Sequence, residues 1–480
     1  MSVKASLNVE DSCVAASSAL RYALSVVLAA VLLHTIPASA QAIASVDIPC
    51  VSLAPAAPLR LNEALDRALC SHPLTSRAWA EVQVRAARAG QAQASRLPTI
   101  SAVLSGSANR SDASSSSAYR PNDAYAGTVR AAELTFEWVL FDFGARSAEV
   151  TRTRELLASA HQTFNAAVID VLYSTARDYF AALTARASAD AARETLSNAS
   201  QSLEAASARL HAGAASKADE LQARTARGQA ALASLNAQAA YDEAIGTLAS
   251  DIGLLPDEPL TLADTPSSTY GNTPQRGAVR TMIDDALQAH PRVLAARAEQ
   301  DATAAAIDSM RAQALPSVAL QAGLSASRRA AVGGGDAGGL PSRSHSSYAG
   351  VRVTIPLFEG FASVYRIGEA RAQAEVQRAA VQETERQVAL EVWKSYQRVG
   401  AAQGALREAQ ALQEDAALAF DAARARYRSG VASIVELLRA QDALSDARRQ
   451  RIIATAEWFV ARLSLAASVG RPDSEGFLLE

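Results

Sequence analysis

Apolar residues along the chain follow two different periods, and the change from one period to the other occurs twice. In residues 62–95 and 279–314 apolar side chains recur at helical spacing, as Leu65 and Leu69 do. Each segment is followed by Leu-Pro, after which the period becomes two. The alternating runs begin near Ile100, Leu134, Val318 and Val351. Each is about nine or ten residues long, enough for a tilted strand to cross a bilayer. The pattern predicts four strands, two behind each helical segment.

The longest predicted elements are two helices. Residues 145–212 contain neither Pro nor Gly, and residues 361–429 contain no Pro and three Gly. At about 1.5 Å per residue, such a helix is about 100 Å long. A glycine ends each one, and a return helix of about half the length follows at 216–250 or 433–468. The shortfall is filled if the segments at 62–95 and 279–314 stack end to end with the return helices.

The two halves of the chain are copies of one unit. Paired landmarks recur in the same order 217 or 218 residues apart, namely His72-Pro73 with His290-Pro291, Leu97-Pro98 with Leu315-Pro316, Leu140-Phe141 with Leu357-Phe358, Gly213 with Gly430, and Ile252-Gly253 with Val469-Gly470. We therefore expect a first structural repeat at 61–255 (helix, two strands, long helix pair) and a second at 279–472. An inter-repeat linker at 256–278 and a C-terminal tail at 473–480 complete this part of the chain.

The N-terminus has the features of a cleaved export signal at residues 1–40. Arg21 precedes an apolar stretch that is too short to span a bilayer, and Ala38-Ser39-Ala40 fits the small-residue rule for cleavage. An N-terminal extension at 41–60 follows. Cys50 and Cys70 remain after cleavage, in an oxidising compartment where a disulfide between them is allowed. The alternative is one buried and one free thiol.

Composition and charge argue against several functions. The formal net charge is -3, whereas nucleic-acid binding needs a concentrated basic face. The six histidines are scattered, with no metal-ligand spacing, and the chain has neither a nucleophile elbow nor a nucleotide-binding loop. We expect no catalytic residue, cofactor or metal. His72 and His290 each precede a proline, so we interpret them as residues that interrupt a helix.

The strand count indicates an oligomer. Four strands cannot close a barrel, and open edges are forbidden in lipid. Two copies give eight strands, and side chains fill the interior of an eight-stranded barrel. Three copies give 12 strands, which leave room for water. The residues expected to face this lumen are small or polar: Ser105, Thr135, Gln321, Ser325 and Thr354. We predict a homotrimer whose apolar row faces lipid.

The sequence resembles the TolC-type outer-membrane export channels from about residue 59 to residue 472. The resemblance rests on the duplication, on Val139-Leu-Phe-Asp-Phe-Gly144 with its partner Ile355-Pro-Leu-Phe-Glu-Gly360, and on the run Tyr427-Arg-Ser-Gly-Val-Ala-Ser-Ile-Val-Glu-Leu-Leu438. It implies a mainly α chain with transmembrane β structure. Three chains would form a 12-stranded β-barrel in the outer membrane, continued into the periplasm by a long α-helical barrel.

The resemblance also assigns the bends at which strands turn into helices. These are Phe141 and Gly144 in the first repeat, and Pro356, Phe358 and Gly360 in the second. Because Val139 stands where Pro356 stands in the second repeat, the first bend must form without proline.

The same resemblance implies a gate at the periplasmic entrance, where the helical hairpin tips constrict the tunnel. Glu436 matches an acidic ring position, and Asp219 matches a residue that accepts a hydrogen bond from a tyrosine matching Tyr427. Arg439 stands where a second acid is usual and is close enough to pair with Glu436. Ala432 stands where an arginine lock is usual. The alternative is that Asp219, Glu436 and Arg439 are ordinary solvated helix charges.

The run at 136–146 and the absence of a lipidation box resemble the type I secretion branch, including channels that export repeat-in-toxin adenylate cyclase haemolysins. That branch implies a periplasmic membrane-fusion adaptor, an inner-membrane ABC transporter and an exported protein. The alternative is drug or metal efflux with a proton-driven pump, where the cargo is a small molecule. A soluble periplasmic helical adaptor is a third possibility, but it does not explain the strands. We expect no nucleic-acid partner, and contact with outer-membrane lipid.

Overall fold

The computed structural model describes residues 58–113, 123–263, 278–331 and 342–470, all of them in one compact unit that begins at Leu53. The predicted export signal, Cys50 and the C-terminal tail lie outside the described residues. So do residues 41–57 of the predicted extension, residues 264–277 of the predicted linker, and the two loops that join paired strands.

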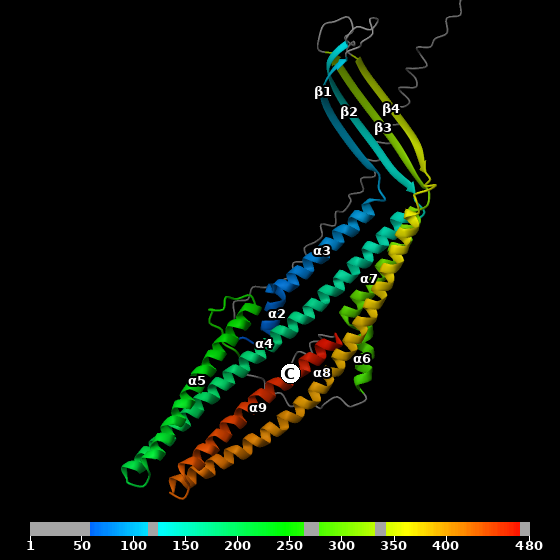
Figure 1. The fold of residues 1–480 in the computed structure, drawn as a ribbon. Coiled ribbons are helices and arrows are strands. Elements are labelled where there is room, and N and C mark those ends of the chain that lie inside the picture. The colour runs from blue at the N-terminus through cyan, green and yellow to red at the C-terminus, as the bar shows by residue number, and fades with distance from the viewer. Residues whose placement is uncertain (1–57, 114–122, 264–277, 332–341, 471–480) are drawn as a thin grey trace, which may run out of the picture. The chain divides into compact units, whose positions relative to one another are not determined.

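Both halves have the same order of elements (Figure 1). The first contains α2 (Leu61–Ser71), α3 (Pro73–Ala94), β1 (Thr99–Ala113), β2 (Asp123–Phe141), α4 (Ala145–His211) and α5 (Lys217–Asp251). The second contains α6 (Ala278–Ala289), α7 (Pro291–Gln313), β3 (Ser317–Ala331), β4 (Ser342–Thr354), α8 (Ala362–Arg428) and α9 (Ile434–Val469). The predicted strand length is wrong, because the strands contain 13 to 19 residues. They continue past the apolar runs, where the sequence no longer shows a clear alternation.

A His-Pro pair separates the first two helices of each half, and the structural role predicted for these histidines is confirmed. The imidazole Nδ1 of His72 accepts a hydrogen bond from the Leu74 amide at 3.2 Å, and that of His290 accepts one from the Arg292 amide at 3.1 Å. Each histidine is therefore the N-cap of the helix that follows, with the proline at its first position, where no amide hydrogen is needed.

The four strands form one antiparallel sheet in the order β1-β2-β3-β4, so β2 and β3 join the two repeats. By register, one face carries the five residues predicted to line a lumen, and hydroxyl pairs cross it between strands, as in Ser325–Ser346 at 2.8 Å. The opposite face carries Ile100, Leu134, Leu324 and Val351. Within the described residues, the outer edges of β1 and β4 have no strand partner.

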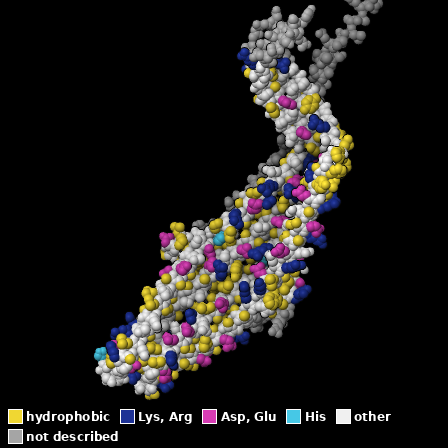
Figure 2. Space-filling view, in the orientation of Figure 1, with side chains coloured by type: hydrophobic (Ala, Val, Ile, Leu, Met, Phe, Trp, Pro, Cys, Tyr) yellow, Lys and Arg dark blue, Asp and Glu magenta, His cyan; other side chains and the backbone are white. Residues whose placement is uncertain are grey.

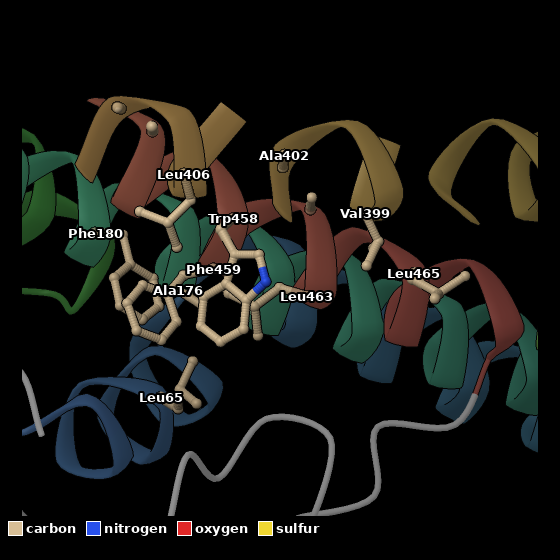
Figure 3. Close-up of a cluster of buried hydrophobic side chains, with 13 residues drawn as sticks. Leu65, Ala176, Phe180, Val399, Ala402, Leu406, Trp458, Phe459, Leu463 and Leu465 are labelled. Carbon is tan, nitrogen blue, oxygen red and sulfur yellow. The ribbon is translucent and has the colours of Figure 1, made fainter. Parts of the chain in front are cut away.

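The helical part packs around α4 and α8, each of 67 residues. A core cluster joins α2, α4, α8 and α9, and Figure 3 shows Phe180 of α4 beside Phe459 of α9. Their rings stack with centroids 4.9 Å apart. Many of the other buried residues are alanines, which let the helices approach closely. Among the described helices only α9 is long and apolar enough to cross a membrane by composition. Its buried residues pack into the clusters shared with α4 and α8.

The return helices end against the His-Pro corners. A Cβ atom built on Gly253, just past α5, would lie 2.4 Å from the Cβ of Ser71 at the end of α2. A Cβ built on Gly470, just past α9, would lie 3.0 Å from the Cα of His290. Both glycines have positive φ, 77° and 79°. The predicted end-to-end stacking of the short helices with the return helices is therefore confirmed.

Candidate functional site

The two helical hairpins, α4–α5 and α8–α9, end in tips of the same construction. Gly213 and Gly430 follow the long helices with φ of 70° and 82°, a left-handed conformation that glycine adopts without strain. Ser216 and Ser433 then cap the return helices by accepting hydrogen bonds from the amides of Asp219 and Glu436. The tips lie next to each other in Figure 1, at the end of the hairpins away from the strands.

Tyr427 lies at the centre of the tip region and is 3% exposed. The Arg209 guanidinium stands 4.8 Å from the centre of its ring, and Arg209 Nη1 donates a 2.7 Å hydrogen bond to the Tyr427 carbonyl oxygen. The Tyr427 hydroxyl is buried without a hydrogen-bond partner among the described residues. Burial raises the pKa of this hydroxyl, the Arg209 charge opposes the shift, and the Asp219 carboxylate adds to it. The contact links α8 of one hairpin to α4 of the other.

In the single chain the Tyr427 hydroxyl forms no hydrogen bond with Asp219, and the bond that the resemblance implies stays a prediction for the assembled channel. The Asp219 carboxylate instead accepts a 3.0 Å hydrogen bond from the Ser216 amide, while the Asp219 amide donates to the Ser216 hydroxyl at 3.2 Å. In this reciprocal capping box, the side chain of each residue accepts a hydrogen bond from the backbone amide of the other at the start of α5. Asp219 therefore lies close enough to Tyr427 to affect its pKa, but is bonded within its own hairpin.

In the single chain Glu436 pairs with Arg426 rather than with Arg439. Glu436 Oε1 lies 2.8 Å from Nη1 of Arg426, at the end of α8, and Arg439 forms no ion pair with a described residue. A basic residue at a helix C-terminus and an acidic residue at the next N-terminus both complement the helix dipoles, and the tight turn brings them together. Both side chains are about half exposed, at 56% and 41%, so the pair contributes at most about 1 kcal/mol.

Further contacts hold the two hairpins together along α4. Glu194 pairs with Arg448 of α9 at 3.0 Å, and the buried Ser202 hydroxyl lies 3.3 Å from the Gln441 side-chain oxygen. Gln201 accepts a 2.7 Å hydrogen bond from Arg424 of α8. An apolar cluster around Phe420, Tyr427 and Leu437 fills the space between these helices. The site is therefore a joint between hairpins as well as a pair of tips.

Arg209 is the residue of this site that the sequence reasoning missed. The 217-residue offset of the repeats makes Arg209 equivalent to Arg426, and Leu210 equivalent to Tyr427. The two arginines nevertheless differ in their partners, since Arg426 pairs within its own hairpin and Arg209 reaches across to the other. The repeat offset is a signal that identifies both positions, but it does not show which partner each takes.

The strand-to-helix bends differ between the repeats, as the missing proline predicts. In the second repeat β4 stops at Thr354, two residues before Pro356, and Gly360 and Phe361 have φ of 60° and 64°. Phe358 is 76% exposed and contacts Phe361 edge to face.

In the first repeat β2 continues to Phe141, with a register shift between Val139 and Phe141, and the ring of Phe141 packs against that of Phe143. Asp142 then accepts hydrogen bonds from the amides of Gly144 and Arg146 and from the Arg146 side chain. Burial opposes ionisation of Asp142, but the Arg146 side chain and these amides outweigh it and lower its pKa. An aspartate therefore organises the bend that has no proline.

Cys70 lies in α2 and is disulfide-bonded. Cys50, the partner predicted for it, lies outside the described residues, so the pairing of Cys50 with Cys70 stays a prediction. Among the described residues, no group of three or more His, Cys, Asp or Glu side chains is placed to hold a metal ion.

Comparisons with known proteins agree with this architecture. Protein CyaE of Bordetella pertussis is 33% identical over 417 residues, which cover 86% of this chain and 84% of that protein. Outer membrane efflux protein BepC of Brucella suis is 27% identical over 306 residues, 63% of each chain. The crystal structure of the outer membrane protein VceC from Vibrio cholerae superimposes with a TM-score of 0.70 at 21% identity, covering 86% of this chain and 96% of that one.

The profile of one protein family matches the chain twice, at residues 64–254 and 282–471, which correspond to the two repeats. This double match spans most of the chain, and the duplicated helices and four-stranded sheet account for it in three dimensions. The chain therefore belongs to the outer membrane efflux protein family.

Proposed function

We propose that three copies of this chain form a channel-tunnel in the outer membrane that serves as the passive exit duct of a tripartite type I protein secretion system. The observation that carries the channel is the four-stranded sheet, which has one polar and one apolar face and, within the described part of the chain, two unpaired edges. A soluble helical adaptor would not need a sheet with one apolar face. The family consists of channels rather than enzymes.

The unpaired edges determine the smallest closed assembly. In lipid, each exposed backbone donor or acceptor of β1 and β4 would cost several kcal/mol, so each edge must pair with an edge of another copy. Three sheets give 12 strands, enough for an aqueous lumen, whereas eight strands are filled by their own side chains. The lumen-facing row of serine and threonine hydroxyls supports this assignment, because it suits contact with water.

The long helices extend this lumen into the periplasm. Each of α4 and α8 has 67 residues and is about 100 Å long, so the helices reach far beyond the membrane. The hairpin tips then lie at the far end, where a periplasmic membrane-fusion adaptor and an inner-membrane ABC transporter meet the duct. Energy must come from those partners, since the sequence contains no nucleotide-binding loop.

We further infer that the tip joint is the entrance gate. Arg209 with Tyr427 is the contact between hairpins that keeps it closed in this proposal, whereas Arg426 with Glu436 sets the charge at the entrance. Three Glu436 side chains around a narrow axis attract cations. Because Arg426 neutralises each of them, we expect weaker cation selectivity than an unpaired acidic ring provides.

Protein cargo is preferred to small molecules in this proposal, because the relative that is named for efflux is the weaker of the two matches. The match to Protein CyaE covers 84% of that protein at 33% identity, whereas the match to an efflux protein, BepC, covers 63% at 27%. Resemblance of the run at 136–146 to the type I secretion branch supports the same choice. Efflux of drugs or metals with a proton-driven pump is the second candidate.

Two measurements test the proposal in turn. Native mass spectrometry of the detergent-extracted protein must give a trimer, and a monomer or dimer would overturn the channel. The gene is then expressed in a strain that lacks its own exit duct, together with either an ABC transporter–adaptor pair or a proton-driven pump–adaptor pair. We expect a repeat-in-toxin substrate in the medium with the first pair. Restored drug resistance with the second pair, without protein secretion, would show that the function is efflux rather than protein secretion.

A further inference from the structure

Three arginines form a row across the apolar face of the sheet. Arg130 of β2 is the register partner of Arg328 of β3, which is in turn the register partner of Arg343 of β4. Directly paired residues project to the same side of a sheet, with their Cβ atoms about 5 Å apart. By alternation, this side is the one that carries Leu134 and Leu324. Figure 2 shows basic side chains at the end of the sheet that is farthest from the helices.

The row is unfavourable for the sheet alone. Like charges directly opposite each other on neighbouring strands are destabilising. None of the three arginines forms an ion pair or hydrogen bond with a described residue, and all three are exposed. On this face of the strands, the described side chains include no Asp or Glu. An anion from outside the protein would relieve this repulsion.

The height of the row above the periplasmic end of the sheet places it at a membrane surface. About ten residues separate Val318, at the start of β3, from Arg328 on the same face. At about 3.3 Å per residue and a strand tilt of about 40°, Arg328 lies about 25 Å above Val318. That height equals the apolar band of an outer-membrane barrel, about 25 Å. At the opposite boundary Trp138 lies on the same face, and its indole donates a 3.0 Å hydrogen bond to the Arg96 carbonyl oxygen.

The surface below the row is shaped to receive an apolar chain. The three arginines, with Leu104 and His345, line a shallow groove of about 590 Å³. A second groove of about 480 Å³ continues toward the membrane centre. It is lined by Leu104, Leu134 and Leu324, by Glu133 and His345 at its sides, and by small residues. A ligand that spans both grooves has a multiply charged anionic head and hydrocarbon tails.

We propose that Arg130, Arg328 and Arg343 bind the phosphate groups of a phosphorylated glycolipid in the outer leaflet, with an acyl chain in the groove below. Guanidinium groups suit this ligand because they bind phosphate bidentately and never lose their charge. Three copies of the row would encircle the barrel at the outer headgroup level. This inference rests on the proposed outer-membrane channel, since only that orientation presents the row to the outer leaflet.

The test uses the full-length trimer, extracted and purified in a neutral detergent. Native mass spectrometry and a thermal-shift assay follow titration with diphosphorylated lipid A, with dephosphorylated lipid A and with inorganic phosphate. We compare the wild type with the triple variant Arg130→Gln, Arg328→Gln, Arg343→Gln. The matched control is Arg329→Gln, an exposed arginine next to Arg328 that projects from the opposite face.

We expect bound diphosphorylated lipid A on the wild type and on the control, with affinity lowered roughly tenfold for each arginine removed from the row. Equal affinity of the triple variant and the wild type, or equal affinity for dephosphorylated lipid A, would overturn the proposal. Inorganic phosphate that binds as tightly as the lipid would overturn the lipid assignment. Should the triple variant fail to assemble, Arg328→Gln alone is measured.

The trimer mass and the single-channel conductance of each variant are recorded first. A conducting trimer that binds no lipid A refutes the arginine row and leaves the channel intact, whereas loss of the trimer in the wild type refutes the channel itself.

Discussion

Replacing Arg209 with alanine should loosen the joint between the two hairpins. The change removes a hydrogen bond from a charged donor to the Tyr427 carbonyl oxygen, worth about 1.5–3 kcal/mol, and a cation–π contact worth about 0.5–2 kcal/mol. Arg209 is half-buried, and the carbonyl keeps a second donor in the Gly430 amide at 3.1 Å. We therefore take the low end of the summed free-energy loss, about 2 kcal/mol for each protomer. That corresponds to about a 30-fold shift toward the open state for each joint.

The assay is single-channel recording of the purified trimer in a planar bilayer, with open probability and conductance as the readouts. Arg426→Ala is the matched control, because Arg426 is the repeat-equivalent of Arg209 but pairs within its own hairpin. We expect a large increase in open probability for Arg209→Ala. For Arg426→Ala we expect mainly higher cation selectivity, because it leaves Glu436 unpaired. Equal effects of the two changes on open probability would refute the joint as the closing element.

Tyr427→Phe separates this mechanism from one in which the tyrosine hydroxyl locks the tip. The hydroxyl has no hydrogen-bond partner among the described residues, so its removal should leave conductance unchanged. Opening of the channel by Tyr427→Phe would show that the hydroxyl gains a partner in the trimer. The resemblance to known channels predicts such a bond with Asp219, and the capping box of α5 would then have to break.

The long elements could be predicted from the sequence because their signals are local. The absence of proline over 145–212 and the glycines at 213 and 430 define helices whose observed ends agree within one or two residues. The repeat offset of 217 residues extends each such observation to the second half. The His290-Pro291 dipeptide also predicts the break between α6 and α7, since proline begins a helix more readily than it continues one.

Contacts between distant segments could not be predicted in the same way. Arg209 and Arg426 occupy equivalent places in the repeats, yet only the packing of the two hairpins decides that one of them meets Tyr427. The arginine row could not be predicted from the sequence for a related reason. Arg130, Arg328 and Arg343 become neighbours only when the register of three strands is known, and a shift of one residue would move a strand's arginine to the other face.

Two further changes test the corner at which α9 ends against α7. Gly470→Ala should lower the stability of the trimer to guanidinium by about 2 kcal/mol, because its Cβ would lie 3.0 Å from the Cα of His290 at a φ of 79°. Gly213→Ala, with φ of 70° and open space, should cost only about 1 kcal/mol, and equal losses would exclude the clash. His290→Asn should keep the cap of α7 and remove a dependence of stability on pH. Burial and then the Arg292 charge lower the pKa of His290 to about 4, although Asp170 and the Ala467 backbone oppose the shift. Between pH 6.5 and about 4 the unfolded chain therefore binds a proton that the folded chain does not, so stability falls as pH falls through this window and is level below it. The full effect is about 3 kcal/mol, measured by guanidinium denaturation in detergent from pH 7 to pH 4. His72→Asn, at the equivalent corner of the first repeat, controls for the altered cap, and an unchanged pH slope in His290→Asn would refute the assignment of this proton to His290.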